Sequence, residues 1–206
     1  MYLCVYLIFI FIFIFVSSYK YVCVFVGREY AYLNREFMLK AMVSCVQDVL
    51  KKEPDWNTFV TVHHNYCTCE SCRYKDNRTG QWREEELWVT RKGATSAKKD
   101  EYGIIPGSMA TGSFIVKGLG NDMSWHSCSH GAGRRMGRKQ AAGILSTKEF
   151  FNQLDASGVV CDRDERLIDE SPLAYKDLNE VIRHQTNASI IKIEHRLLPL
   201  VNVKGF

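Results

Sequence analysis

A glycine-rich segment in the second half of the chain constrains the fold more tightly than any other feature. Residues 126–138 read HSCSHGAGRRMGR, so His130 stands directly before a Gly-Ala-Gly turn, and arginines follow it. Glycine adopts backbone conformations that other residues avoid, and successive amides in such a turn can surround an anion. Guanidinium groups add paired hydrogen bonds to phosphate oxygens. The segment predicts a phosphate-binding turn with a histidine placed to attack phosphorus. The alternative is an ordinary loop before a basic helix.

Five further blocks of sequence accompany this segment. They are VHHNYC (62–67), LWVTRKGATSA (87–97), GIIPGSMATGSFIVKGLGN (103–121), SPLAYKDLNEVI (171–182) and LLPLVNVKG (197–205). Taken in this order with the glycine-rich segment, they closely resemble the RtcB family of RNA-splicing ligases, which join RNA ends with GTP and manganese. The resemblance extends from about Tyr30 to Gly205 and is looser at residues 67–86 and 146–165.

The resemblance implies a GTP-dependent RNA ligase of tRNA splicing or RNA repair, with a cytoplasmic location. In that family a histidine attacks GTP and becomes covalently bound to GMP. The GMP is passed to an RNA 3′-phosphate, which can first be generated from a 2′,3′-cyclic phosphate. A 5′-hydroxyl then seals the strand and releases GMP. His130 matches the guanylylated nucleophile, and its attacking nitrogen must be unprotonated.

Other site residues follow from the resemblance. His64 matches a manganese ligand, and Asn65 matches a nucleotide contact. Lys92 matches a lysine needed for activity, and Arg134 matches an arginine beside the nucleophile. By themselves, His64 would be read as part of the polar end of a strand and Lys92 as a solvated charge.

The resemblance also assigns a binding site for GMP. Lys204 matches a lysine that recognises the base, Tyr175 could stack on the guanine, and Phe206 is one residue beyond the family's usual end. The loops that hold the nucleotide are matched by Pro106, Gly107, Ser108, Met109 and Ser113, and by Gly131, Ala132 and Gly133 beside the nucleophile.

The first part of the chain lacks residues that the resemblance would require. The family's first half supplies a DxxC-type motif, two further histidine ligands and an Asn-His segment. Residues 1–60 contain no histidine, and their aspartates are Asp48 and Asp55. We therefore expect the C-terminal part of a ligase, with an incomplete two-manganese site and little activity alone. A second chain supplying the missing part, an inactive fragment that binds GMP or RNA, and a remnant without function are the alternatives.

Residues 1–26 form an apolar leader that is foreign to the family, and residues 27–206 form the ligase-like part. The run YLCVYLIFIFIFIFV (2–16) is shorter than the roughly 20 residues of a spanning helix. We favour a mispredicted start of the reading frame. A membrane anchor, an aggregation-prone β segment and a secretory signal are the alternatives.

The composition is that of a folded domain. Hydrophobic residues make up 46% of the chain, and the net charge of +4 is compatible with RNA without being diagnostic of it. Among the eight cysteines, Cys67, Cys69 and Cys72 form a CxCxxC cluster. Because no companion pair follows at zinc-finger spacing, we expect reduced loop cysteines rather than a zinc site.

The patterning predicts an α+β fold of mixed, RtcB-like sheets and helices, with an active site built on loops and an incomplete N-terminal side. A helix is expected over residues 29–50 and an exposed loop over 73–86. Strands are expected at 59–65, 87–90 and 113–117.

Three further helices are expected in the second half. One over residues 134–144 would begin at the glycine-rich turn and so favour an anion at its N-terminus. Ser146 or Thr147 would cap a helix through Leu154, and Asp177 would cap a helix near 178–187.

Overall fold

The computed structural model describes residues 20–204, with the side chains of 20–25 excepted. The apolar run 2–16 and Phe206 therefore lie outside the described residues. The chain divides into two compact units, one ending at Phe59 and one beginning at Val60, and each is described by itself.

The first unit consists of helix α2 (Lys20–Leu50) and the short 3-10 helix η1 (Trp56–Thr58). Helix α2 is longer than the predicted 29–50 and passes residues 26 and 27 without a break. The apolar side chains of Phe37, Met38 and Met42, which suggested an amphipathic helix, are exposed. In the part of the chain that the structure describes, no helix has both the length and the apolar character needed to cross a membrane.

The second unit begins with an antiparallel hairpin of β1 (Asn65–Lys75) and β2 (Trp82–Lys92). Its turn is closed by the amide of Asp76, which donates to the carbonyl of Gln81 at 2.9 Å. The predicted loop at 73–86 holds only for the turn at 76–81, because 73–75 and 82–86 are strand. The predicted strand at 59–65 is wrong except at Asn65, where pairing starts. The charged residues suggested a loop, whereas in the hairpin they occupy exposed strand positions.

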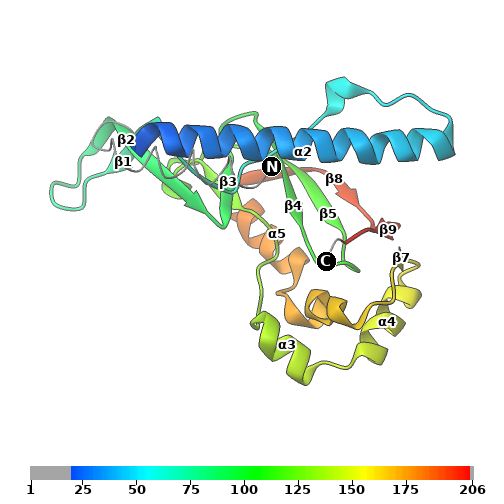
Figure 1. Cartoon of the computed structure of the whole chain (residues 1–206). Coiled ribbons are helices and arrows are strands. Elements are labelled where there is room, and N and C mark those ends of the chain that lie inside the picture. The colour runs from blue at the N-terminus through cyan, green and yellow to red at the C-terminus, as the bar shows by residue number, and fades with distance from the viewer. Residues whose placement is uncertain (1–19, 205–206) are drawn as a thin grey trace. The chain divides into compact units, whose positions relative to one another are not determined.

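A sheet of β4 (Tyr102–Pro106), β5 (Ser113–Gly118) and β8 (Ile191–Leu197) carries the main core, in the order β4-β5-β8 (Figure 1). Helix α5 (Leu178–Asn187) buries Leu178 and Ile182 in the same core. Strands β4, β5 and β8 contribute Ile105, Phe114, Val116 and Ile191 to that core. Burial of such side chains contributes about 1.5–3 kcal/mol each.

Short elements complete the unit. Strand β3 (Ala94–Ser96) pairs with β6 (Ser127–Ser129), and β7 (Val160–Cys161) pairs with β9 (Val201–Asn202) in parallel. The 3-10 helices are η2 (Asp122–Ser124), η3 (Glu165–Glu170) and η4 (Pro172–Ala174).

A second core lies between helix α4 (Thr147–Ala156) and η3. Phe150 and Leu154 of the helix pack with Leu167 and Ile168. Ser146 caps α4 by accepting a hydrogen bond from the amide of Glu149. Asp177 likewise caps α5, so both predicted caps are confirmed.

Helix α3 (Arg138–Ile144) begins later than the sequence predicted. The amide of Arg135 donates to the carbonyl of Ala174 at 2.8 Å, and Arg134 forms a β-bridge with Tyr175. These bonds hold Arg134 and Arg135 outside the helix, so the glycine-rich turn is not at a helix N-terminus. The predicted α+β class is confirmed.

Candidate active site

The pairing of β3 with β6 places His130 beside the end of β2. Strand β2 ends at Lys92, Gly93 turns the chain with φ +75°, and Ala94 then pairs with Ser129. His130 follows directly, and a methyl group built on Gly93 would lie 3.6 Å from its Cε1 and 3.7 Å from its Nδ1. The Nδ1–Cε1 edge of the imidazole therefore faces Gly93.

His64 lies against the same imidazole. The ring centroids of His64 and His130 are 5.8 Å apart, and the ring planes are inclined by 20°. The backbone joins them as well, since the amide of Gly93 donates to the carbonyl of His64 at 3.1 Å. The residue matched to the nucleophile and the residue matched to a metal ligand thus lie side by side in the fold.

Lys92 and Asn65 lie at the same end of the hairpin. They face each other as the first pair of the β1–β2 register, and both are exposed. Because side chains alternate along a strand, this pair projects from the face opposite to that of the buried Arg91. Lys92 immediately precedes Gly93, so its backbone lies next to the turn that faces His130.

The turn after His130 is joined to the predicted GMP loop. The amide of Ala132 donates to the carbonyl of Pro106 at 2.9 Å, and a Cβ on Gly131 would lie 3.0 Å from that oxygen. A contact this short is tighter than ordinary van der Waals packing, so glycine favours the close approach. Because Ala132 uses its amide here and Arg135 donates to Ala174, these two amides are not part of an anion nest.

A pocket of about 380 Å³ opens beside the same loop. Its lining includes Pro106, Gly107, Ser108, Met109, Ser113, Glu170 and Lys204. The loop closes through the amide of Gly107, which donates to the carbonyl of Gly112 at 2.7 Å, and the amide of Ser108, which donates to Oγ1 of Thr111 at 2.7 Å. Lys204 therefore reaches the predicted nucleotide loop from the opposite end of the sequence.

Arg134 turns toward a cluster of acidic residues. Its Nη1 donates to the carbonyl oxygen of Asp169 at 2.7 Å, and its Nη2 donates to the hydroxyl of Tyr175 at 2.8 Å. The guanidinium carbon lies 4.6 Å from the centroid of the Tyr175 ring. Arg138 joins the cluster through Oδ2 of Asp169 at 2.5 Å. The cluster positions Arg134 through Tyr175 and Asp169.

Glu170 connects this cluster to the pocket. Its carboxylate accepts hydrogen bonds from Tyr175 and from Lys204, and it lies 3.3 Å from Nη2 of Arg134. Burial alone would raise the pKa of Glu170, but the hydrogen bonds from Lys204 and Tyr175 and the nearby positive charges hold it below its usual value. Burial and the bond to Glu170 raise the pKa of Tyr175 to about 12. Glu170 is thus a buried anion that connects Tyr175 to Lys204.

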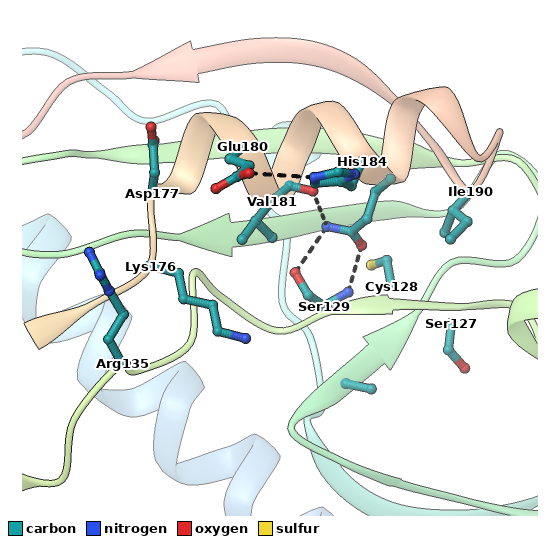
Figure 2. Close-up of a pocket in the computed structure, with 12 residues that line it drawn as sticks. Ser127, Cys128, Ser129, Arg135, Lys176, Asp177, Glu180, Val181, His184 and Ile190 are labelled. Atoms are coloured by element: carbon teal, nitrogen blue, oxygen red, sulfur yellow. Dashed lines mark hydrogen bonds and ion pairs between the residues drawn. The ribbon is translucent and has the colours of Figure 1, made fainter.

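An open groove of about 780 Å³ lies between β6 and helix α5 (Figure 2). Ser127, Cys128 and Ser129 line it, together with Lys176 and His184 (Figure 2). Buried Gln185 holds Ser129 at two points, accepting from its amide at 2.7 Å and donating to its hydroxyl at 3.0 Å. These bonds fix the residue directly before His130.

The comparison with known proteins assigns the family. The sequence profile described as tRNA-splicing ligase RtcB matches residues 17–205. The chain belongs to the RtcB family. RNA-splicing ligase RtcB and RNA-splicing ligase RtcB1, both from Escherichia coli, are each 41% identical to it over 182 residues. The tRNA-splicing ligase RtcB of Nanoarchaeum equitans is 30% identical over 196 residues.

These alignments cover different shares of the proteins. Each includes 85% of this chain, but only 41% of either Escherichia coli protein and 40% of the Nanoarchaeum protein. The chain therefore spans about two fifths of the length of these RtcB relatives.

RtcB proteins use manganese and GTP. Among the described residues, no group of three or more His, Cys, Asp or Glu side chains could hold a metal ion. His64 and His130 approach each other as two imidazoles, whereas a stable site normally has three or more protein ligands. The residues present therefore do not fit the two-manganese site, and no chemical step is assigned to a metal on this chain.

The cysteine cluster is divided between the two faces of the hairpin. Cys67, Cys69 and Cys72 lie on β1 rather than in a loop. Cys72 is buried and Cys69 is exposed. Since neighbouring strand positions face opposite sides, the three thiols do not converge on one ion.

Two residues near the site have no role assigned by the resemblance. Glu170 was not singled out, although it immediately precedes the matched block that begins at Ser171. The buried Arg91 pairs with Glu70 at 2.6 Å and 2.9 Å. The Glu70–Arg91 pair depends on the pairing of β1 with β2, and the sequence predicts no strand around Glu70.

Proposed function

We propose that this chain holds GMP and accepts it on His130, as part of a GTP-dependent RNA ligase. The ligase would join an RNA 3′-phosphate or 2′,3′-cyclic phosphate to a 5′-hydroxyl end, in tRNA splicing or RNA repair. The observation that carries the proposal is the bond of 2.9 Å between the amide of Ala132 and the carbonyl of Pro106. It joins the turn after His130 to the loop beside the pocket of Ser108 and Lys204.

The first chemical step is assigned to Nε2 of His130. The Nδ1–Cε1 edge of the ring faces Gly93, so Nε2 is the nitrogen that is turned away from that backbone. Neutral imidazole has a lone pair on one nitrogen, which attacks the α-phosphorus of GTP. A phosphorus–nitrogen bond forms, the bond to the bridging oxygen of the β-phosphate breaks, and pyrophosphate leaves.

The later steps transfer the nucleotide and seal the RNA. An oxygen of the RNA 3′-phosphate attacks the phosphorus on His130, the phosphorus–nitrogen bond breaks, and the RNA end carries GMP. The 5′-hydroxyl oxygen then attacks the 3′-phosphate, loses its proton, and GMP leaves. Lys92, exposed at the end of β2, supplies positive charge for the phosphates of the RNA.

The pocket beside Ser108 would receive the guanosine. Lys204 and Glu170 lie at its wall as a bonded pair, which offers both a donor and an acceptor to a polar base edge. Tyr175 does not line the pocket, but its hydroxyl donates to Glu170. Its contribution here is therefore to position the Glu170 carboxylate.

The proposal includes a requirement for metal ligands from another segment. His64 is the matched ligand among the described residues, and the others needed for two manganese ions have no counterpart there. We therefore expect the chain to be inactive or severely impaired alone. A polypeptide corresponding to the unmatched part of an RtcB relative should restore activity.

The test is covalent labelling with α-labelled GTP and manganese. The chain is incubated alone, and also with a separately expressed segment of the Escherichia coli RtcB protein that this chain does not match. We expect little label on the chain alone and acid-labile label when the segment is added. Strong label without the segment would contradict the proposed need for further ligands.

Two variants identify the labelled residue. In His130→Ala the label should vanish, whereas His184→Ala, an exposed histidine on α5, should be labelled normally. Label that persists in His130→Ala would show that another residue is the nucleophile. If GTP and RNA bind but no label forms in any mixture, the alternative of an inactive binding fragment is supported instead.

A further inference from the structure

The turn end of the β1–β2 hairpin and η2 enclose a second groove. Its volume is about 460 Å³, and its lining includes Arg73, Tyr74, Lys75, Arg78 and Trp125. None of its lining residues lines the pocket at Ser108 or the groove beside Ser129.

Two aromatic rings form a shelf in the groove. The centroids of Tyr74 and Trp125 are 5.8 Å apart, and their planes are inclined by 28°. Trp125 is 43% exposed although it is a large apolar side chain. Aromatic faces that remain accessible in this way offer stacking surfaces to planar ligands, above all to nucleobases.

The backbone that carries Trp125 is strained. Trp125 has φ +53° and His126 has φ +47°, so two consecutive residues other than glycine adopt the left-handed conformation. Such strain persists only where the surroundings enforce it, and it clusters at functional sites.

The buried side chain of Arg91 holds these two residues in their strained conformation. Its Nη2 donates to the carbonyl of Trp125 at 3.1 Å and to that of His126 at 3.4 Å. Glu70 in turn holds the guanidinium through two bonds. A buried ion pair therefore fixes the loop that presents Trp125 at the surface.

The charge in the groove is predominantly positive. Among the described residues, the side chains of Arg73, Lys75 and Arg78 form no ion pair. Both acids of the groove have hydrogen-bonding partners. Asp76 pairs with Arg83 at 2.8 Å, and Asp122 lies 2.9 Å from His126. Arg73 stacks over Trp82, and both Arg73 and Lys75 project from the face of the hairpin opposite to Tyr74. Of the described cations in the groove, unpaired Arg78 in the turn is therefore the one placed to attract a phosphate to the aromatic shelf.

We propose that this groove is a binding site for single-stranded nucleic acid, with bases stacked on Tyr74 and Trp125 and a phosphate held by Arg78. A duplex does not suit the site, because its bases are stacked on one another and their faces are closed. The proposal does not depend on the ligase chemistry, since binding to this groove involves neither His130 nor GTP. A failure of one proposal therefore leaves the other untouched.

The test measures binding of the full chain to a labelled 12-nucleotide oligouridylate by fluorescence anisotropy, without GTP or manganese. Trp125→Leu should weaken binding about tenfold, as expected for the loss of one stacked base. The matched control is Trp88→Leu. Trp88 is 53% exposed, but it pairs with Cys69 and so lies on the face of the hairpin opposite to Tyr74.

A second variant removes charge instead of stacking. Arg78 is exposed in the turn, so Arg78→Ala leaves the hairpin folded. It should lower the slope of log affinity against log salt by about one. The thermal unfolding midpoint of each variant confirms that the chain is folded.

Several results distinguish the sources of binding. Equal binding of RNA and DNA single strands supports the proposal, because stacking does not require a 2′-hydroxyl. Equal affinities of Trp125→Leu and Trp88→Leu would overturn it. So would duplex RNA binding as tightly as the single strand.

Discussion

The imidazole rings of His64 and His130 are stacked with centroids 5.8 Å apart, although 65 residues lie between them in the sequence. The strand register explains this proximity. Gly93 follows β2 and donates its amide to His64, while its neighbour Ala94 pairs with Ser129. The hydrogen bond of Gly93 to His64 and the pairing of Ala94 with Ser129 therefore bring both histidines to the same turn of the chain.

The first prediction concerns the loop at the predicted GMP pocket. Gly112 has φ +79°, and a Cβ there would fall against the carbonyl oxygen of Leu197. Gly112→Ala should therefore lower the free energy of unfolding by on the order of 4 kcal/mol. Gly80→Ala is the control, since Gly80 has φ +70° and open space around it. That variant should cost only about 1–2 kcal/mol. Urea denaturation measures both, and similar losses would contradict the close approach.

The second prediction concerns the buried ion pair. Arg91 is 2% exposed and Glu70 is 6% exposed, so removing one charge leaves the other buried and unpaired. Arg91→Met should lower the free energy of unfolding by about 3–5 kcal/mol. The exposed Arg78→Ala should change it by less than about 0.5 kcal/mol. An equal effect of the two variants in urea denaturation would count against a structural role for the pair.

The third prediction is the acid dependence of the same pair. Burial would raise the pKa of Glu70, but the hydrogen bonds and charge of Arg91 lower it below its usual value. An unfolded glutamate titrates near pH 4.3, at about its model value. The stabilisation from Glu70 is therefore complete above about pH 4.3 and is lost as the pH falls through the lower folded pKa.

Denaturation at a series of pH values tests this. Glu70→Gln should show a weaker loss of stability below pH 4 than the unchanged chain, from a lower starting value. Glu84→Gln, a change at an exposed position of β2, should follow the unchanged chain. Parallel acid curves for the chain and for Glu70→Gln would refute the pKa shift.

The fourth prediction concerns alkaline pH. Burial and the bond to Glu170 raise the pKa of Tyr175 to about 12, against about 10 for an unfolded tyrosine. The folded state then holds its proton more tightly, so stability from this group is full below about pH 10 and declines as the pH rises toward 12. In Tyr175→Phe this decline should be absent. Difference absorbance of the two proteins near 295 nm should show a phenol titrating near pH 12, and a normal titration near pH 10 would exclude the shift.

The fifth prediction uses the cysteines as probes of the hairpin. Cys69 is exposed, whereas Cys72 and Cys128 are buried. Alkylation of the native chain, followed by peptide mass analysis, should modify Cys69 first and the other two only after denaturation. Zinc titration against a chromophoric chelator should show no tight site at the CxCxxC cluster, because its thiols face both sides of the strand. Zinc-dependent protection of Cys69 and Cys72 together would require a different structure of β1.

Local features were predictable from the sequence because their causes are local. Ser146 and Asp177 accept hydrogen bonds from amides two or three residues ahead, and both caps were predicted. The strand at 113–117 was also found, as part of β5. The hairpin was missed because charged residues at 73–86 suggested a loop, whereas an exposed strand face tolerates charge.

The resemblance indicated which residues to examine, and the structure shows which of them meet. Lys204 and the loop at Pro106 line one pocket, and His64 stacks on His130. The roles of these residues in catalysis remain predictions. The bond network of Glu170 with Tyr175 and Lys204 could not be inferred, since it joins segments from different parts of the chain.

The amino-acid sequence by itself determined the family, the α+β class, the helix caps and the glycine turn, because these depend on neighbouring residues or on a matched pattern. Only the tertiary structure decided where helix α3 begins and where Arg134 points. Residues 134 and 135 could have begun the helix, but their backbone bonds with Tyr175 and Ala174 keep them outside it. The physical reason is that a hydrogen bond to a distant strand competes with one inside a helix, and nothing in the local sequence reports the position of the distant partner.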